Sequence, residues 1–531
     1  MAQIAIARPL SAFNEVSDNV YRSNFISSPT VKDTIGFGSP SKVISGNVRY
    51  ERLLGDSEQS YYFQSRGEGV NDMYLHLGFH ASAQLVQRTR VRAVWAILRV
   101  RHPLLASKVV MRDYDAVSFV YTSPRSSDEA LMIADENLEY RSATKDELID
   151  SYLNGPRTLS DERLSYLILS QSGISDNGLP NHDILICATH FLGDGMALHQ
   201  FANDFFSLLG STKTDSELET EVHDECRKRW SSSFNNAIPD SLESRLPEEG
   251  NRLCRVAAEI DFKRSQEKLI GGHAFPRRSA TKRHTIVPTV AFDAQRTKAI
   301  LKSCKAHGVS VSAALFAICN IAWARLTSDK PELPVMMYSA LNLRPYLNAT
   351  PANDSYWYLA VGYFNIIFPN FVPKSLDIAS TFWQRAKSAK EQSTRAGKYP
   401  MIVSRSRLMA RERGRRSRAW AREDDEKERG TWVPPEPSND PKPKPHAPST
   451  ALIGLSLLGN LDGMYKHANF VDIKLHSLTT GSRQRSGGML LFGYTFAGKL
   501  WISLGYDENG FDQEVVQTFW RNCLTAIDNF L

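Results

Sequence analysis

The sequence predicts an α/β (α+β) fold built from two halves. Strand-like apolar runs alternate along the chain with stretches in which apolar residues recur at helical spacing, as is typical of mixed folds. The 531 residues exceed the about 100–200 residues of an ordinary domain, so more than one core is expected. A basic, glycine-punctuated stretch at 261–284 follows neither period, which places the division between residues 46–270 and residues 271–531.

The first half is expected to begin with an arm. Residues 1–45 are rich in Ser, Asn, Pro and Gly and show little periodicity, which predicts a leader arm. The clearest helix covers 84–101, where Val91, Val94 and Leu98 share one face, and it ends at a His-Pro pair, as a proline requires. The remaining elements are strands at 109–111, 116–121, 164–170 and 184–189, and a helix at 196–209.

The second half repeats this mixture. A helix at 309–326 is apolar on nearly all sides and should therefore be buried, and Ser310 or Ser312 can cap its first turn. The other elements are expected to be strands at 285–292, 333–339, 363–368, 451–457, 489–496 and 500–506, and helices at 293–307 and 514–530.

Residues 404–449 interrupt this pattern. Eight arginines lie between Arg405 and Arg422, an acidic run follows at 423–426, and 433–448 is rich in proline. This composition is typical of a solvated, mostly disordered insertion, whose deletion should leave activity and melting temperature nearly unchanged. A functional basic patch and a retained non-coding segment of the gene are the alternatives.

Composition excludes several classes of protein. The formal net charge of +6 is small for this length and comes largely from the arginine-rich stretch, so nucleic acid is not an expected partner. No run of about 18 apolar residues occurs, and the first residues resemble neither a secretory signal nor a transit peptide, so no membrane span is expected. The six cysteines are scattered without a C-x-x-C pair. We expect a cytoplasmic monomer.

The segment His190-Phe191-Leu192-Gly193-Asp194-Gly195 carries the candidate chemistry. A histidine on an apolar strand is more often a core residue, but His190 ends the buried strand at 184–189 and is followed by two glycines that permit a tight turn. A base that deprotonates an alcohol needs a pKa near 7, and imidazole is the side chain nearest to it. The chain has no G-x-S-x-G elbow, H-E-x-x-H zinc site or Walker loop.

The pattern H-x-x-x-D-G after an apolar strand resembles the active-site motif of the chloramphenicol-acetyltransferase-like superfamily of CoA-dependent acyltransferases. The resemblance covers 48–531 apart from the insertion, and the chain looks most like the fungal trichothecene O-acetyltransferases of the alcohol-acetyltransferase branch. Further segments agree in the expected order: Arg101-His102-Pro103-Leu104-Leu105, Asn342-Leu343-Arg344-Pro345, Ser456-Leu457-Leu458-Gly459-Asn460, and 500–507 with Phe511.

The resemblance implies two similar halves that meet along a tunnel, with His190 midway as general base. CoA would enter from one face and the acceptor from the other. Asp194 would pair with Arg344 across the halves and hold the loop. Gly195 would leave room for substrate, the amide of Gly195 and the hydroxyl of Ser456 would donate to the oxyanion, and Ser456 and Asn342 would bind substrate.

The implied reaction is transfer of an acyl group, above all acetyl, from CoA to a hydroxyl of a secondary metabolite such as a sesquiterpenoid. Acetyl-CoA or another acyl-CoA is then a co-substrate, the partner is a small-molecule alcohol, and no metal or redox cofactor is implied. Thr189 stands where condensation domains usually carry a second histidine, which favours O-acylation, and Leu491-Phe492-Gly493-Tyr494 differs from the plant-type D-F-G-W-G. The alternatives are a free-standing condensation-type enzyme that takes its acyl group from a carrier protein, and a non-catalytic binding protein.

Overall fold

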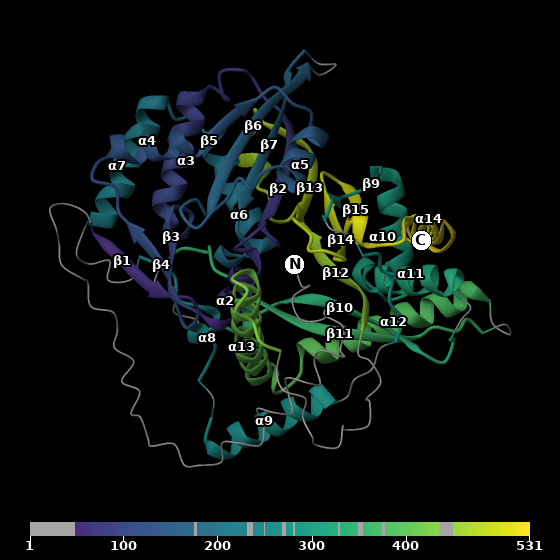
Figure 1. Ribbon diagram of the computed structural model, residues 1–531. Coiled ribbons are helices and arrows are strands. Elements are labelled where there is room, and N and C mark those ends of the chain that lie inside the picture. The colour runs from purple at the N-terminus through teal and green to yellow at the C-terminus, as the bar shows by residue number, and fades with distance from the viewer. Residues whose placement is uncertain are drawn as a thin grey trace.

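The computed structural model describes residues 48–531 except 175–177, 231–236, 249, 268–271, 280–281, 328–329, 349–353, 374–376 and 435–449. The expected leader arm at 1–45 therefore lies outside the described residues. The described chain forms three sheets with helices packed on them, so the predicted mixed α/β fold is confirmed (Figure 1).

The first half contains a five-stranded sheet and a three-stranded sheet. The larger sheet has the order β13-β2-β7-β6-β5: Lys474–Ser482, Met73–His80, Pro180–Ala188, Ser165–Ile174 and Leu138–Arg141. The smaller sheet has the order β1-β4-β3: Arg49–Leu53, Ala116–Thr122 and Lys108–Asp113. The accompanying helices are α2 (Asp56–Ser65), α3 (Arg88–Arg101), η2 (Pro103–Ala106), α4 (Ser127–Glu136), α5 (Lys145–Asn154), η3 (His190–Leu192), α6 (Gly195–Leu209), α7 (Asp215–Trp230), α8 (Leu242–Arg245) and α9 (Arg252–Glu267).

The second half is built on a seven-stranded sheet. Its order is β11-β10-β12-β14-β15-β8, with β9 also on β15: Val361–Pro369, Pro334–Asn342, Ala451–Asn460, Met489–Phe496, Lys499–Asp507, Thr285–Ile286 and Thr289–Phe292. The helices are α10 (Ala294–Ala306), α11 (Val311–Leu326), η4 (Arg344–Tyr346), α12 (Ile378–Gly397), α13 (Ile402–Glu428), η5 (His467–Asn469), η6 (Glu508–Gly510) and α14 (Gln513–Phe530).

The two faces of the seven-stranded sheet pack into different hydrophobic cores. Leu455 and Leu491 face one core that also contains residues of α10, α11, α12 and α14. The residues on either side of Leu491 in β14 point the other way. They are Leu490, Phe492 and, two positions further, Tyr494, and they belong to the core of the first half. β14 thus contributes side chains to both hydrophobic cores, one from each face of the sheet.

β13 crosses from one half to the other. It comes late in the chain, yet it pairs antiparallel with β2, from Lys474 opposite His80 to Ser482 opposite Met73. Figure 1 shows this yellow-green strand beside the purple β2. The first sheet therefore takes its edge strand from the region assigned to the second half.

The strands and helices predicted from periodicity occur in the structure, with one strand divided. The expected strand at 285–292 is wrong as a single element, because it is interrupted at Val287-Pro288 into β8 and β9. Proline has no backbone N–H with which to continue a strand ladder. The aperiodic stretch assigned to 261–284 begins inside α9, which ends at Glu267.

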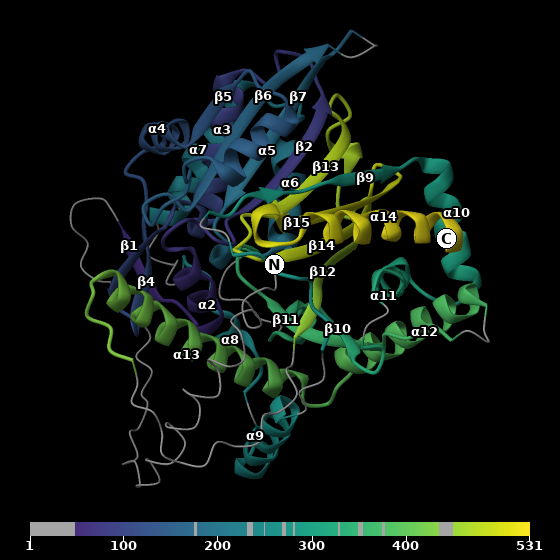
Figure 2. The same cartoon turned by 45° about the vertical axis from the view of Figure 1, so that its right-hand side comes forward.

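The prediction that 404–449 is a disordered insertion is wrong for its first part, because α13 covers Ile402–Glu428; 435–449 lie outside the described residues. Figure 2 shows α13 running along α2. The small residues Ala410, Gly414, Ser417 and Ala421 recur at helical spacing and are buried. A Cβ at Gly414 would lie 2.9 Å from the Cβ of Asp56, so the two helices are in close contact.

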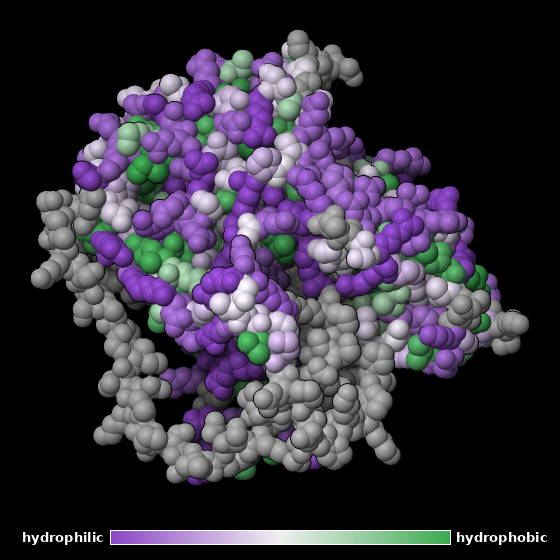
Figure 3. Space-filling view, viewed as in Figure 1, coloured by the Kyte–Doolittle hydropathy of each residue, from purple (hydrophilic) through white to green (hydrophobic). Residues whose placement is uncertain are grey.

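The surface of the molecule is mostly polar on the face seen in Figure 3, where hydrophobic residues form small separate groups. None of the described helices is by itself long and apolar enough to cross a membrane. α10 and α11 meet the length and composition criteria only as a pair, which is bent by 92°.

Candidate active site

His190 lies where β7 gives way to a tight turn. The strand is buried along its length, and the chain leaves it through η3 and Gly193 before α6 begins. A Cβ at Gly193 would lie 3.0 Å from Cε3 of Trp357 and 3.2 Å from the Cβ of Ala197, so a side chain there would displace the tryptophan. The glycine thus allows the turn to pack under Trp357.

The imidazole of His190 is buried and stacks on Tyr61 of α2, with ring centroids 4.1 Å apart and planes inclined by 18°. Within the described part of the chain, neither ring nitrogen has a hydrogen-bond partner. The pKa of His190 is lowered to about 3, mainly by burial and to a smaller extent by the positive charge of Arg413, while the carboxylate of Asp194 opposes the shift. The expected pKa near 7 is therefore not found in this structure, and the imidazole is neutral.

Asp194 holds the loop that carries His190 rather than the imidazole itself. Its carboxylate caps α6, accepting from the backbone N–H of Met196 at 3.1 Å and of Ala197 at 3.3 Å. It also accepts from Nη1 of Arg344 at 2.8 Å and from the N–H of Ala360 at 3.0 Å. The predicted pair of Asp194 and Arg344 is confirmed.

Electrostatics keep this pair ionised. Burial raises the pKa of Asp194, but the charge of Arg344 and the hydrogen bonds outweigh it, so the net pKa is lowered. Burial likewise lowers the pKa of Arg344, and Asp194 raises it above its ordinary value. The guanidinium also donates to the carbonyl of Tyr358 at 3.2 Å. The loop that carries His190 is thus fixed from the end of β10.

Asn342 stands beside Arg344 but faces solvent. Its Oδ1 accepts from the backbone N–H of Arg344 at 3.0 Å, which stabilises the turn into η4. The structure therefore gives it a contact that positions Arg344, while substrate binding by Asn342 stays a prediction.

Ser456 and Gly195 are both buried. Ser456 is two residues beyond Gly454 on β12, so the two share one face of the strand. That face lies toward Tyr338, whose ring occupies the space that a Cβ of Gly454 would need. Among the described residues, no hydrogen bond joins Ser456 to His190. Gly195 is the first residue of α6, directly after the capping Asp194. The oxyanion roles of both stay predictions.

Three residues of this region were not predicted from the sequence: Tyr61, Tyr363 and Arg413. The hydroxyls of Tyr61 and Tyr363 are hydrogen-bonded to each other. Cζ of Arg413 lies 5.3 Å from the ring centroid of Tyr61 and 4.7 Å from that of Tyr363. The stripe of small residues in 410–421 is the sequence signal that could have placed Arg413 on a packed helix.

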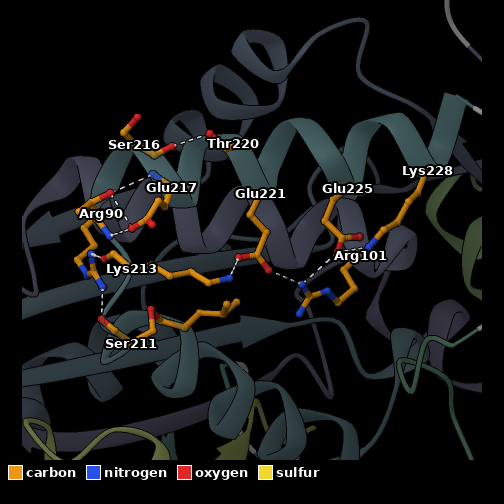
Figure 4. Close-up of polar contacts among 12 residues, drawn as sticks. Arg90, Arg101, Ser211, Lys213, Ser216, Glu217, Thr220, Glu221, Glu225 and Lys228 are labelled. Atoms are coloured by element: carbon orange, nitrogen blue, oxygen red, sulfur yellow. Dashed lines mark hydrogen bonds and ion pairs between the residues drawn. The ribbon is translucent and has the colours of Figure 1, made fainter.

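A hollow lies on the surface along α7, where Figure 4 shows a row of alternating charges. Arg101 reaches Glu221 at 3.0 Å and Glu225 at 3.1 Å, and Lys228 reaches Glu225 at 2.9 Å. These charges are engaged with one another, and none belongs to the loop of His190. The hollow is therefore distinct from the candidate active site.

Comparisons with known proteins support the fold. No family model and no curated protein sequence matches the chain. Trichothecene 15-O-acetyltransferase from Fusarium sporotrichioides superposes with a TM-score of 0.70 at 12% identity, covering 93% of this chain and 97% of that chain. The condensation domain of monacolin K polyketide synthase gives 0.54 at 12% identity, covering 91% and 97%. The epimerization domain of tyrocidine synthetase B gives 0.53 at 14%, covering 92% and 99%.

The chain therefore has the chloramphenicol-acetyltransferase-like fold, as the resemblance predicted. At such low identity the superposition establishes the fold, and the chemistry has to be argued from the site.

Proposed function

We propose that this protein is an O-acyltransferase that moves an acyl group, above all acetyl, from CoA to a hydroxyl of a secondary metabolite such as a sesquiterpenoid. The observation that carries the proposal is His190, a buried neutral imidazole with no partner on either ring nitrogen among the described residues. Its loop is tied to the other half by Asp194 and Arg344. A buried polar group without a partner is unfavourable unless a ligand completes it.

In the proposed step, His190 accepts the proton of the acceptor hydroxyl while that oxygen attacks the thioester carbonyl carbon. The new C–O bond gives a tetrahedral oxyanion, toward which the amide of Gly195 and the hydroxyl of Ser456 are the candidate donors. Collapse breaks the C–S bond. The proton on His190 passes to the departing sulfur, which releases the ester and CoA and restores the neutral imidazole.

Asp194 takes no proton in this scheme. Its carboxylate is engaged with Arg344, Ala360 and the start of α6, so it acts by holding the loop. Its negative charge also raises the pKa of His190, which favours the imidazolium that forms during the reaction.

The test is transfer by the purified protein from a panel of acyl-CoAs to sesquiterpenoid alcohols of the trichothecene class, read by mass spectrometry. We expect acetyl-CoA to support turnover, and His190→Ala to lose about 10²–10⁴ of the rate while its melting temperature stays close to wild type. Near-wild-type turnover in His190→Ala would exclude the mechanism.

A second candidate donor is an acyl group on a carrier protein, because condensation and epimerization domains share the fold. Thr189 instead of a second histidine favours ester formation. Supplying the acyl group on a phosphopantetheinyl carrier protein in a parallel reaction separates the two donors. Transfer from the carrier alone would replace CoA in the proposal, and transfer from neither would favour the binding-protein alternative.

A further inference from the structure

Arg413 is a buried cation without a counter-ion in the described part of the chain. It projects from α13 with 5% of its surface exposed and lies against the rings of Tyr61 and Tyr363. Burial lowers its pKa, but the two tyrosines raise it above its ordinary value, so the guanidinium stays charged. A buried charge with no counter-ion is strongly unfavourable.

The unpartnered atoms of Arg413 form one edge of the guanidinium. Nε and Nη2 are both buried and neither has a hydrogen-bond partner. The same edge of Arg157 binds the carboxylate of Asp72, with Nε 2.7 Å from Oδ2 and Nη2 3.1 Å from Oδ1. Two parallel N–H groups match the two oxygens of a carboxylate.

In the described part of the chain, only His190 and Arg413 each have two buried side-chain nitrogens without a hydrogen-bond partner. Both lie against the ring of Tyr61, and the charge of Arg413 lowers the pKa of His190. Arg413 therefore lies close to the reacting centre rather than at a remote structural position.

We propose that Arg413 forms a carboxylate-binding subsite beside His190, so that one of the two substrates carries a carboxylate close to the reacting atoms. This inference rests on the proposed function. The carboxylate can belong to the acceptor, which is then a hydroxy acid, or to the acyl group of a dicarboxylic acyl-CoA such as malonyl-CoA. Either would complete the buried guanidinium with a bidentate pair.

Direct binding tests the subsite without catalysis. Melting temperatures are measured at constant ionic strength with acetate and benzoate, and with acetamide and benzamide as neutral matches. We expect the carboxylates to raise the melting temperature of the wild type by about 1–2 °C and the amides to have no effect. Arg413→Gln should abolish the shift, whereas Arg411→Gln, an exposed arginine on the same helix, should keep it.

Should Arg413→Gln fail to fold, Arg413→Lys retains the charge but lacks the two-pronged edge, and its carboxylate shift should be smaller than that of the wild type. Equal shifts with carboxylates and amides, or an equal loss in Arg411→Gln, would overturn the subsite.

Kinetics identify which substrate carries the carboxylate. One arm pairs acetyl-CoA with a hydroxy acid and its methyl ester, and the other pairs a neutral alcohol with malonyl-CoA and acetyl-CoA. Loss of a charged hydrogen-bonding group predicts a fall in kcat/KM of about 10–100-fold in Arg413→Gln, mainly through KM and only where the carboxylate is present. An equal fall with neutral substrates would show a purely structural role and reject the proposal.

The two hypotheses fail in different ways. If Arg413→Gln loses the carboxylate shift but no acyl-CoA supports transfer, the subsite stands and the proposed function fails. If transfer proceeds and no carboxylate depends on Arg413, the function stands and the subsite is rejected.

Discussion

His190 shows how burial sets the state of a single residue. The ring is held by stacking on Tyr61 and not by hydrogen bonds, so both nitrogens are available to a substrate. Asp194 does not contact the ring nitrogens, unlike the carboxylate of a serine-protease triad. Stacking on Tyr61 therefore orients the imidazole, and the carboxylate of Asp194 fixes the loop.

The pH dependence of the reaction should reflect this burial. Because only neutral His190 accepts a proton and its pKa is lowered to about 3, the neutral form prevails at every pH above that value. We expect kcat/KM to show no inflection near pH 6.5 between about pH 5 and 8. Initial rates across this range, with circular dichroism as the control for folding, measure it. In Tyr61→Ala, where solvent reaches the ring, the pKa should move back toward its ordinary value and an acid limb near pH 6.5 should appear. An acid limb near pH 6.5 in the wild type would contradict the prediction.

The pair of Asp194 and Arg344 makes a second prediction. Asp194→Asn or Arg344→Met alone should remove most activity, because each leaves a buried charge without its partner. The double variant should lose much less than the sum, giving a coupling of about 0.5–3 kcal/mol in a double-mutant cycle on kcat/KM. Asp194→Asn combined with Arg278→Met, an exposed arginine bonded to Asp512, is the additive control. Additivity in the first cycle would show that the pair is not coupled.

At the scale of elements, α13 forms ion pairs with segments of the first half that are far apart in the sequence. Arg405 pairs with Asp261 of α9, Arg418 with Asp56 of α2 at 3.0 Å, and Asp425 with Arg66 at 2.8 Å. The same helix brings Arg413 to Tyr61. The arginines that suggested a solvated segment are thus engaged mainly with the first half.

The close contact of α13 with α2 depends on Gly414. In Gly414→Val the branched side chain would meet Asp56, so α13 must move away from α2. We expect a loss of stability of about 1–3 kcal/mol, seen as a lower melting temperature, and a fall in activity because Tyr61 and Arg413 shift. Arg411→Val changes an exposed site of the same helix and should alter neither. Equal melting temperatures for the two variants would show that α13 does not pack as described.

The sequence predicted those elements whose pattern is local. The strand before His190 is an uninterrupted apolar run, and the two glycines that follow predicted the turn, whereas the pair with Arg344 was implied by the family resemblance. α13 was missed because its buried stripe consists of small residues such as Ala410 and Gly414, which carry little hydrophobic signal among the arginines. Tyr61 was missed because it lies in α2, a helix with apolar and polar residues buried on all sides. Both depend on contacts between distant segments.

At the scale of the whole molecule, β13 joins the halves into one unit. It completes the first sheet on β2, while β12 and β14, which flank it in sequence, belong to the second sheet. Tyr494 of β14 also donates its hydroxyl proton to the carbonyl of Leu478 of β13 at 2.8 Å. Neither sheet can lose its structure without disturbing the other.

Unfolding should therefore be a single transition. Leu75→Ala in the first core and Leu491→Ala in the second core each remove buried apolar volume, and both should lower the same melting temperature. Calorimetry of the two variants measures this, with Arg411→Ala as a surface control. Two transitions, each moved by only one of the variants, would contradict the coupling.

The shared strand also bears on how the protein is made. β2 ends at His80, but β13, which pairs with it, begins at Lys474. The ribosome must therefore synthesise all the residues between them before the five-stranded sheet can be completed. At about 5–20 residues per second, this leaves the apolar β2 edge open for about 20–80 s. An open, apolar strand edge is a template for aggregation. Chaperones that cover the nascent chain during this interval should therefore govern the yield of soluble protein.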